Sequence, residues 1–466
     1  MTTWATVSSR MAVLIRTAGV VVCVLALELS AHGTVSAEPA ATTMTVHPGQ
    51  RTGAIHAELV GSNEPVEMAE TVKDASDPLM RRLSPSWVRT FAHFDLTFDG
   101  RPNYDCATGA WDSGPLDREN AHIRAQGAQP VVVVGYAPTC LNGAQPGQPV
   151  LAASPMEHAD RWNSLVATMA AHEIADGVRT FEVWNEPDTS LMFSPIAYPE
   201  LYADTVGVLE DAAAAAGVHI EVGGPALAVG DDPLVAEPFL AFVAARGLPL
   251  DFVSWHWYSE LICLSSCPTP TPGTFADQVR RMRAMVARYP ALHPKLWISE
   301  WNLGSAGDSR VGEPYGGAYA ASALMRMQQA GLDRACIFLT AGDPGLAMIQ
   351  DSGTRPGPQY EVMAFWRALG PIQVASDITD GQEQITALAS TDDAGRVTVL
   401  LTNFMPSGNS AGRTTTVRLD DGNYQWTEAV IDAAHNGDIS ATGAGRSATL
   451  TMTANTTALL TFTPRR

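Results

Sequence analysis

Short apolar segments alternate with longer helix-like segments through most of this chain, and this alternation constrains the fold more than any other feature. Some apolar segments are continuous, as in Val131–Val134. Such runs are typical of strands buried on both faces, as in a parallel sheet covered by helices. The predicted strands are eight in number: Ile55–Gly61, Trp87–Phe94, Pro130–Ala137, Thr180–Trp184, Ile220–Gly223, Phe252–His256, Leu296–Ser299 and Ala335–Thr340.

Ala-rich segments with amphipathic spacing lie between these strands and predict helices. The clearest are Ser154–Ala175, Tyr198–Ala216, Thr274–Arg288 and Gly317–Gln329. The first begins with Ser-Pro, which is typical of an N-cap followed by proline at the first helical position. Repeated strand–helix units over residues 51–370 predict an α/β fold, a (β/α)8 TIM barrel.

The alternation ends near residue 370, and residues 371–466 have a different character. Thr, Val and Leu dominate strand-like runs such as residues 396–403 and 457–463, and clusters of Gly and Asp separate them. This pattern predicts a C-terminal antiparallel β-sandwich. A Thr- and Val-rich stretch at residues 41–50 can add a further strand to it.

Residues 1–37 are typical of a secretory signal peptide. Arg10 and Arg16 precede an apolar run at Ala18–Leu29, and the small residues up to Ala37 fit a cleavage site. The run is short for a membrane span, so no stable membrane insertion is expected after cleavage. We therefore expect a secreted or periplasmic protein.

The cysteines beyond this segment predict disulfides, because exported proteins usually pair them. Cys106 and Cys140 each follow a predicted strand and can pair, and Cys263 and Cys267 share one Pro-rich loop and can also pair. Cys336 lies inside an apolar strand, where a buried free thiol is expected. The His and Cys spacing does not resemble a zinc site, so no metal is expected.

The chain is acidic, with a formal net charge of −20 over 466 residues and no basic run. This balance argues against nucleic acid and anionic membrane surfaces as partners. A neutral oligosaccharide or polysaccharide is compatible with it. The sequence gives no indication of the oligomeric state.

Two of the predicted strands run into a glutamate. The strand at 180–184 is followed by Asn-Glu-Pro-Asp with its glutamate at Glu186, and the strand at 296–299 is followed by Glu300. Pro187 cannot donate to a sheet and biases Glu186 away from the helical region, so the strand stops there. Catalytic groups of β/α barrels collect at such strand ends, and paired carboxyl groups suit glycoside hydrolysis.

Counted along the chain, Glu186 ends the fourth strand and Glu300 the seventh, which resembles clan A of the retaining β/α-barrel glycosidases. With the C-terminal sandwich, the chain resembles glycoside hydrolase family 39, which includes β-xylosidases, α-L-iduronidases and bacterial exopolysaccharide glycosidases. The segment Phe338–Ala341 departs from the clan, because it lacks a Trp that many members carry there. Further segments that resemble the clan are Leu59–Asn63, Val88-Arg89, Val222–Pro225 and Asp251–Tyr258.

The resemblance implies Glu186 as the acid/base and Glu300 as the nucleophile of a double displacement, with no cofactor. It also implies a group of supporting and substrate-binding residues, each of which also has a purely structural interpretation. These are Asn185 for the sugar 2-hydroxyl, His256 for a carboxylate or hydroxyl, Tyr258 and Arg89 for orienting Glu300, Trp301 for stacking, and His93 for a substrate contact.

Three functions remain open at this level. The leading one is an exported, β-xylosidase-like retaining glycosidase, and an endo-acting exopolysaccharide glycosidase is the alternative enzyme. A non-catalytic carbohydrate-binding protein on the same barrel is the alternative of another class. The two glutamates in their strand-end settings favour an enzyme over a binding protein.

Overall fold

The computed structural model describes residues 41–465 except 66–67, 93, 95–102, 143–153, 189–197, 231, 260–270, 306, 380–384 and 408–411. The predicted signal peptide, His93 and the Cys263–Cys267 pair lie outside the described residues. Residues 39–466 form one compact unit. None of the helices within the described part is long and apolar enough for a membrane span.

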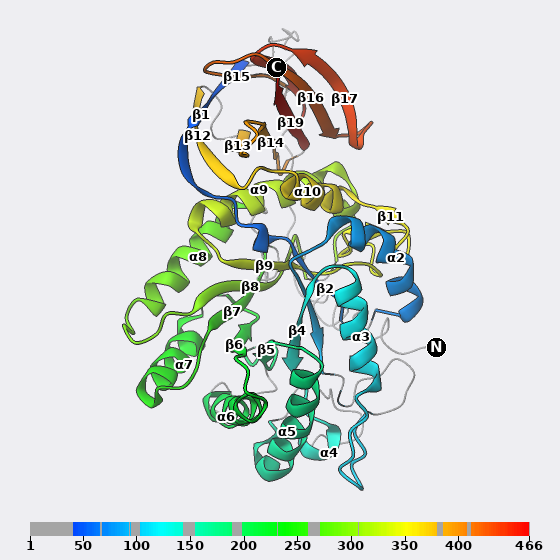
Figure 1. The fold of residues 1–466 in the computed structure, drawn as a ribbon, viewed down its shortest axis with the longest axis vertical. Coiled ribbons are helices and arrows are strands. Elements are labelled where there is room, and N and C mark those ends of the chain that lie inside the picture. Colours follow the sequence, from blue (N-terminus) through cyan, green and yellow to red (C-terminus); the bar gives the residue numbers. More distant parts are fainter. Residues whose placement is uncertain are drawn as a thin grey trace, which may run out of the picture. The chain divides into compact units, whose positions relative to one another are not determined.

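Eight parallel strands close into a barrel in chain order, from β2 to β9 (Figure 1). The continuous apolar runs are buried as predicted, since Val131–Val134 have at most 1% exposure. This confirms the predicted barrel. Its strands are β2 (Gly61–Asn63), β3 (Trp87–Phe91), β4 (Gln129–Val134), β5 (Thr180–Val183), β6 (Glu221–Leu227), β7 (Phe252–Tyr258), β8 (Lys295–Asn302) and β9 (Arg334–Ile337).

The first barrel strand lies later than predicted, and the expected strand at Ile55–Gly61 is wrong. The backbone N–H of Ile55 donates to Pro371 O, and that of His56 donates to the side chain of Gln328. Ala57–Leu59 then form a 3-10 turn. Because the backbone N–H groups of Ile55 and His56 are used in these bonds, the hydrogen-bonded pairing with β3 begins only at Gly61.

Helices cover the barrel and position its strand ends. Ser154 caps the turn before α5 as predicted, because its side chain accepts a hydrogen bond from Met156 N. The α-helices are α2 (Glu70–Leu83), α3 (Gly114–Ala125), α4 (Thr139–Asn142), α5 (Ala159–Ala175), α6 (Tyr198–Ala216), α7 (Pro233–Arg246), α8 (Gly273–Val286), α9 (Pro314–Ala330) and α10 (Pro358–Arg367). The short elements are 3-10 turns at Pro155–His158 and Ser309–Gly312, and the strands β10 (Ile349–Gln350) and β11 (Arg355–Pro356).

The C-terminal residues and β1 together form a nine-stranded sheet in the order β17-β16-β19-β14-β13-β12-β1-β15-β18. Met44 of β1 and Phe462 of β19 share one buried cluster although three strands separate them in this order, so the sheet folds over onto itself. Its strands are β1 (Ala41–Ala54), β12 (Ile372–Thr379), β13 (Ile385–Thr391), β14 (Val397–Asn403), β15 (Arg413–Leu419), β16 (Tyr424–Ile431), β17 (Asn436–Ala444), β18 (Ser447–Met452) and β19 (Thr456–Pro464).

The predicted strand at residues 41–50 joins this sheet, as β1. It pairs antiparallel with β12 and parallel with β15. The parallel pair is the one departure from the predicted antiparallel pattern among the described pairings of the sheet. The sheet is thus built from both ends of the described chain.

The barrel and the sheet share buried side chains through α9, which contacts β13, β14 and β19. Phe404, which follows β14, packs on Tyr315 and Tyr319 of α9 with ring centroids 5.1 and 5.7 Å apart. Leu400 and Leu459 of the sheet belong to the same buried cluster as the barrel helices. The two parts are therefore not separated by a solvated linker.

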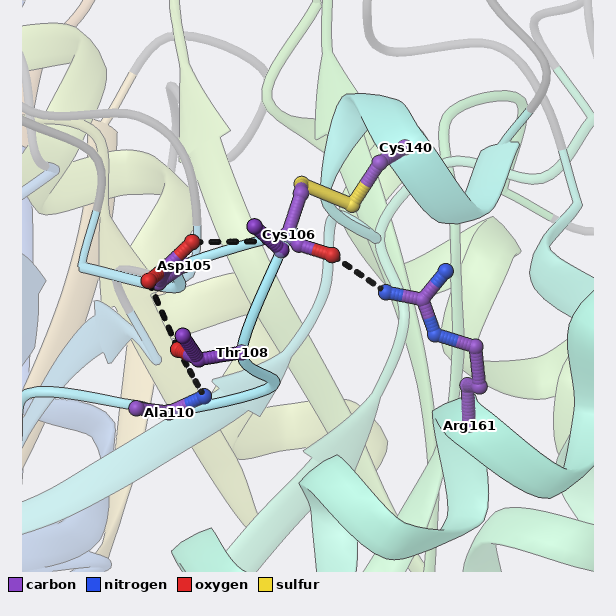
Figure 2. Close-up of a disulfide and its surroundings, with 7 residues drawn as sticks. Asp105, Cys106, Thr108, Ala110, Cys140 and Arg161 are labelled. Carbon is purple, nitrogen blue, oxygen red and sulfur yellow. Dashed lines mark hydrogen bonds between the residues drawn. A yellow bond between two sulfur atoms is a disulfide. The ribbon is translucent and has the colours of Figure 1, made fainter.

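Cys106 and Cys140 form a disulfide that joins the loop before α3 to α4, as Figure 2 shows. Arg161 of α5 donates to the carbonyl of Cys106 over 3.0 Å, which adds a third element to this junction. The prediction for this pair is confirmed. Cys336 is a buried free cysteine, also as predicted.

Candidate active site

Glu186 and Glu300 are both placed at the C-terminal ends of barrel strands. Glu186 follows β5, and its backbone has a φ of +50°, a left-handed conformation that is uncommon for residues other than glycine. Its N–H donates to Ala226 O over 2.9 Å, which ties the turn to the end of β6. Glu300 lies within β8, close to its end. One carboxyl group thus comes from a turn fixed by hydrogen bonding and the other from a strand.

The two carboxyl groups lie close together on either side of His256. The Nδ1 atom of His256 is 2.8 Å from Glu186 Oε1 and 3.4 Å from Glu300 Oε2. One oxygen of each glutamate and one nitrogen of His256 all lie within 4.8 Å of one another. The sequence predicted two glutamates at one end of a barrel, and the structure brings them into a single group.

Both oxygens of Glu300 have a hydrogen-bond donor. Tyr258 Oη–H donates to Oε2 over 2.7 Å, and Arg89 donates to Oε1 over 2.7 Å. Burial raises the pKa of Tyr258, and the nearby charge of Glu300 adds to this, so the phenol remains a donor. The side chain of Glu300 is 9% exposed and that of Glu186 is 27% exposed. Glu300 is therefore fixed in orientation, and Glu186 is the more exposed of the two.

Arg89 connects Glu300 to the rest of the group. It also donates to Glu182 Oε2 over 2.5 Å and to Asn185 Oδ1 over 2.6 Å. Burial acts to lower the pKa of Arg89, but the charges of Glu182 and Glu300 outweigh burial and raise it. The guanidinium therefore stays charged and compensates two buried acids.

Asn185 extends the network to Tyr136, a residue that the sequence did not single out. The amide of Asn185 donates to Tyr136 Oη over 2.6 Å. Burial raises the pKa of Tyr136, so this hydroxyl is neutral and keeps a proton to donate. Glu182 was also missed. A carboxylate in the middle of an apolar strand signals a buried positive partner, and that partner is Arg89.

His256 bridges the two glutamates from β7. Burial acts to lower the pKa of His256, whereas the charge of Glu300 and the hydrogen bond to Glu186 raise it, and the net direction is upward. Glu186, His256 and Glu300 could also ligate a cation by their spacing. The two donors on Glu300 and the charge of Arg89 disfavour that arrangement.

The structure corrects the prediction that Trp301 stacks on a sugar. It is fully buried, and its ring packs against Phe275 of α8 with the centroids 5.7 Å apart. Successive residues of a strand point to opposite faces, so Trp301 faces the helices while Glu300 faces the barrel interior. A ring buried in this way has no free face for a sugar, and we do not assign it a substrate contact.

The fold and the paired glutamates together define the class of β/α-barrel glycosidases. Residues 114–419 match the family described as "Glycosyl hydrolases family 39". The chain therefore belongs to glycosyl hydrolases family 39.

Known proteins similar to this chain include a beta-xylosidase of Geobacillus stearothermophilus, 29% identical over 205 residues. That match spans 40% of this chain and 40% of the relative's length. Among solved structures, a monomeric β-xylosidase from Caulobacter crescentus CB15 has a TM-score of 0.72 at 17% identity, covering 91% of this chain and 100% of that one. A glucosidase from Croceicoccus marinus has a TM-score of 0.71 at 18% identity, covering 92% of this chain and 100% of that one. At these identities, the similarity to the two solved structures shows a shared fold.

Proposed function

We propose that this protein hydrolyses glycosides with retention of anomeric configuration, with Glu300 as the nucleophile and Glu186 as the acid/base. The observation that supports this most strongly is that one carboxylate oxygen of Glu186 lies within 4.8 Å of one carboxylate oxygen of Glu300. Retaining enzymes place the two carboxyl groups about 5–5.5 Å apart, whereas inverting enzymes need about 6.5–9.5 Å to admit a water. The separation fits direct attack by a carboxylate.

In the first step Glu300 attacks the anomeric carbon and Glu186 donates its proton to the leaving oxygen. The bond from the anomeric carbon to that oxygen breaks, the alcohol departs, and a glycosyl ester forms on Glu300. In the second step Glu186 takes a proton from water, whose oxygen attacks the anomeric carbon. The ester bond breaks, and Glu300 is released as a carboxylate with Glu186 protonated again.

The exposure of the two carboxyl groups suits these roles. Glu186 is the more exposed of the two, which suits contact with a departing alcohol and an incoming water. Glu300 is held at both oxygens by Tyr258 and Arg89, which suits a nucleophile that must meet one carbon atom. Arg89 still has Glu182 as a partner after the charge of Glu300 is lost in the ester.

Asn185 is the residue we assign to the sugar 2-hydroxyl. Its oxygen accepts from Arg89 and its amide donates to Tyr136, so its orientation is fixed next to Glu186. A hydrogen bond to the 2-hydroxyl that strengthens in the transition state contributes several kcal/mol to retaining catalysis. Replacement of Asn185 by Ala is expected to lower kcat far more for a substrate that carries this hydroxyl than for its 2-deoxy analogue.

We propose a β-xylosidase-like substrate and an exported protein. The first rests on two relatives of this chain that are beta-xylosidases, one from Geobacillus stearothermophilus and one from Caldicellulosiruptor saccharolyticus. The second is supported by the signal-like N-terminal sequence and by the disulfide between Cys106 and Cys140, since such bonds persist in oxidising compartments.

The test is a panel of aryl glycosides and polysaccharides, assayed with wild type and with Glu300→Ala. Release of xylose from an aryl β-xyloside by wild type, and not by the variant, is the expected result. Shortening of a polymer without cleavage of any aryl glycoside would instead identify an endo-acting enzyme. Polysaccharide binding without turnover in both proteins would identify a binding protein and contradict the proposal.

A further inference from the structure

A second cluster of ligand-type side chains lies between α3 and α5, apart from the active-site group. Asp117 comes from the first turn of α3, and His172 and Glu173 come from the last turn of α5. One carboxylate oxygen of each acid and one ring nitrogen of His172 lie within 4.8 Å of one another. His172 Nε2 is 2.7 Å from Asp117 Oδ1. Two helices thus contribute to one compact group of potential ligands.

The interior side of this cluster has unmatched hydrogen-bond acceptors. Asn120 of α3 donates to Glu173 Oε2 over 2.6 Å, and both residues are fully buried. Glu173 Oε1 and Asn120 Oδ1 are buried with no hydrogen-bond partner among the described residues. A buried acceptor without a donor is costly, and two at one contact call for a shared positive partner. This second observation distinguishes the cluster from an ordinary surface ion pair.

We propose that Asp117, His172 and Glu173 form a binding site for a divalent transition-metal ion, with zinc as the best match. Two carboxylates and one imidazole are typical zinc ligands, and three protein ligands leave a position for water. The ion would link the first turn of α3 to the last turn of α5.

A bound cation would balance the charge of the two carboxylates. Arg124 of α3 donates to Asp176 over 2.7 Å through Nη1, and its Nη2 has no hydrogen-bond partner among the described residues.

The experiment is calorimetric titration of metal-free protein with zinc chloride, comparing wild type, His172→Ala and Glu173→Gln. His435→Ala is the matched control, because His435 also contacts one carboxylate, Asp432, and its side chain is 39% exposed against 43% for His172. We expect wild type and His435→Ala to bind one zinc equivalent that the other two variants lose or bind at least about tenfold more weakly.

Zinc taken up by the active-site glutamates would be common to all four proteins, so the difference between them reports the proposed site alone. Glu173→Gln keeps the shape of the side chain and removes its charge, so it is expected to fold even if His172→Ala does not. Unfolding curves recorded without metal check this. Zinc should raise the Tm of wild type more than that of Glu173→Gln.

Equal zinc binding by wild type, His172→Ala and Glu173→Gln would overturn the proposal. So would the absence of zinc binding to wild type at about 1 mM, which corresponds to a negligible affinity. Binding of calcium in preference to zinc would also overturn it, since a site that depends on imidazole should prefer the transition metal.

Discussion

At the scale of single residues, the candidate site depends on one buried cation that serves two buried acids. Arg89 contacts Glu182 and Glu300 together, and all three side chains are at most 9% exposed. Removing one partner of a buried ion pair leaves an uncompensated charge, which costs far more than an exposed pair contributes. Arg89 is therefore expected to matter for stability as well as for positioning the nucleophile.

Replacement of Arg89 by Met tests this arrangement. We expect a loss of about 3–5 kcal/mol in the free energy of unfolding, measured by urea denaturation at neutral pH. Arg81→Met is the control, because Arg81 is an exposed residue paired with Asp77 on α2 and should cost about 1 kcal/mol or less. Equal losses in the two variants would show that Arg89 is not the buried counter-charge described above.

The two glutamates are expected to respond differently to the leaving group. An aryl glycoside with a strongly acidic phenol needs no proton to depart, whereas one with a weakly acidic phenol does. Glu186→Ala should therefore slow release of the poor leaving group by about 10²–10⁴-fold and affect the good one much less in pre-steady-state assays. Glu300→Ala should abolish release of both leaving groups. A uniform loss with Glu186→Ala would contradict its role as the acid.

At the scale of elements, β2, α2 and α3 meet around a buried carboxyl group. Glu64 follows β2 and accepts from Gln126 over 3.0 Å, and burial together with the charge of Glu119 raises its pKa to about 8. The other charged or titratable groups facing it are Lys73 and Asp77 of α2 and His122 of α3, with Lys73 paired to Glu119.

The raised pKa of Glu64 makes stability depend on pH. The folded state holds the proton up to about pH 8, whereas the unfolded chain releases it near its ordinary value of 4.5. The contribution of Glu64 to the free energy of unfolding is thus complete below its pKa in the unfolded chain. It is lost as the pH rises through its pKa in the folded state. The free energy of unfolding of Glu64→Gln should gain roughly 3–4 kcal/mol on that of wild type between about pH 5 and pH 8. Glu157→Gln, at an exposed position, should gain nothing, and a flat difference for Glu64→Gln would refute the account.

The positions of strands could be predicted from the sequence where they depend on neighbouring residues. The continuous apolar run of β4 and the Asn-Glu-Pro stop after β5 depend on neighbouring residues, and both were predicted close to their observed bounds. The first barrel strand was misplaced, because its start is set by distant bonds to Pro371 and Gln328. No local pattern carries such information.

The same distinction applies to the site. The glutamates were predicted from strand ends, whereas Arg89, His256 and Tyr258 were expected only through the family resemblance. Glu182 carries a sequence signal as a carboxylate inside an apolar strand, but its partner, and the role of Tyr136, emerge only when β3, β4 and β5 lie side by side. Trp301 was misjudged because the expectation took no account of the side of the barrel wall to which it points.

At the scale of the whole molecule, barrel and sheet share one buried core through α9. Leu388, Leu400 and Phe404 of the sheet belong to the barrel cluster, and β1 joins the sheet from the N-terminal side. A chain of residues 41–369 would expose these α9 contacts and leave β1 unpaired. We expect it to be insoluble, or to lack cooperative thermal unfolding, whereas residues 41–466 should unfold in one transition. Cooperative folding of the shorter chain would show that the barrel is independent.

The central claim is that Glu300 forms the covalent bond to the sugar, and mass spectrometry tests it most directly. The protein is incubated with a 2-deoxy-2-fluoro xylosyl fluoride, which forms the glycosyl ester readily and hydrolyses it slowly, and is then digested at low pH. The account predicts one added fluoroxylosyl group, located on Glu300 and absent from Glu300→Gln. Labelling of a different residue, or turnover of an aryl β-xyloside to the inverted sugar without any covalent adduct, would contradict it.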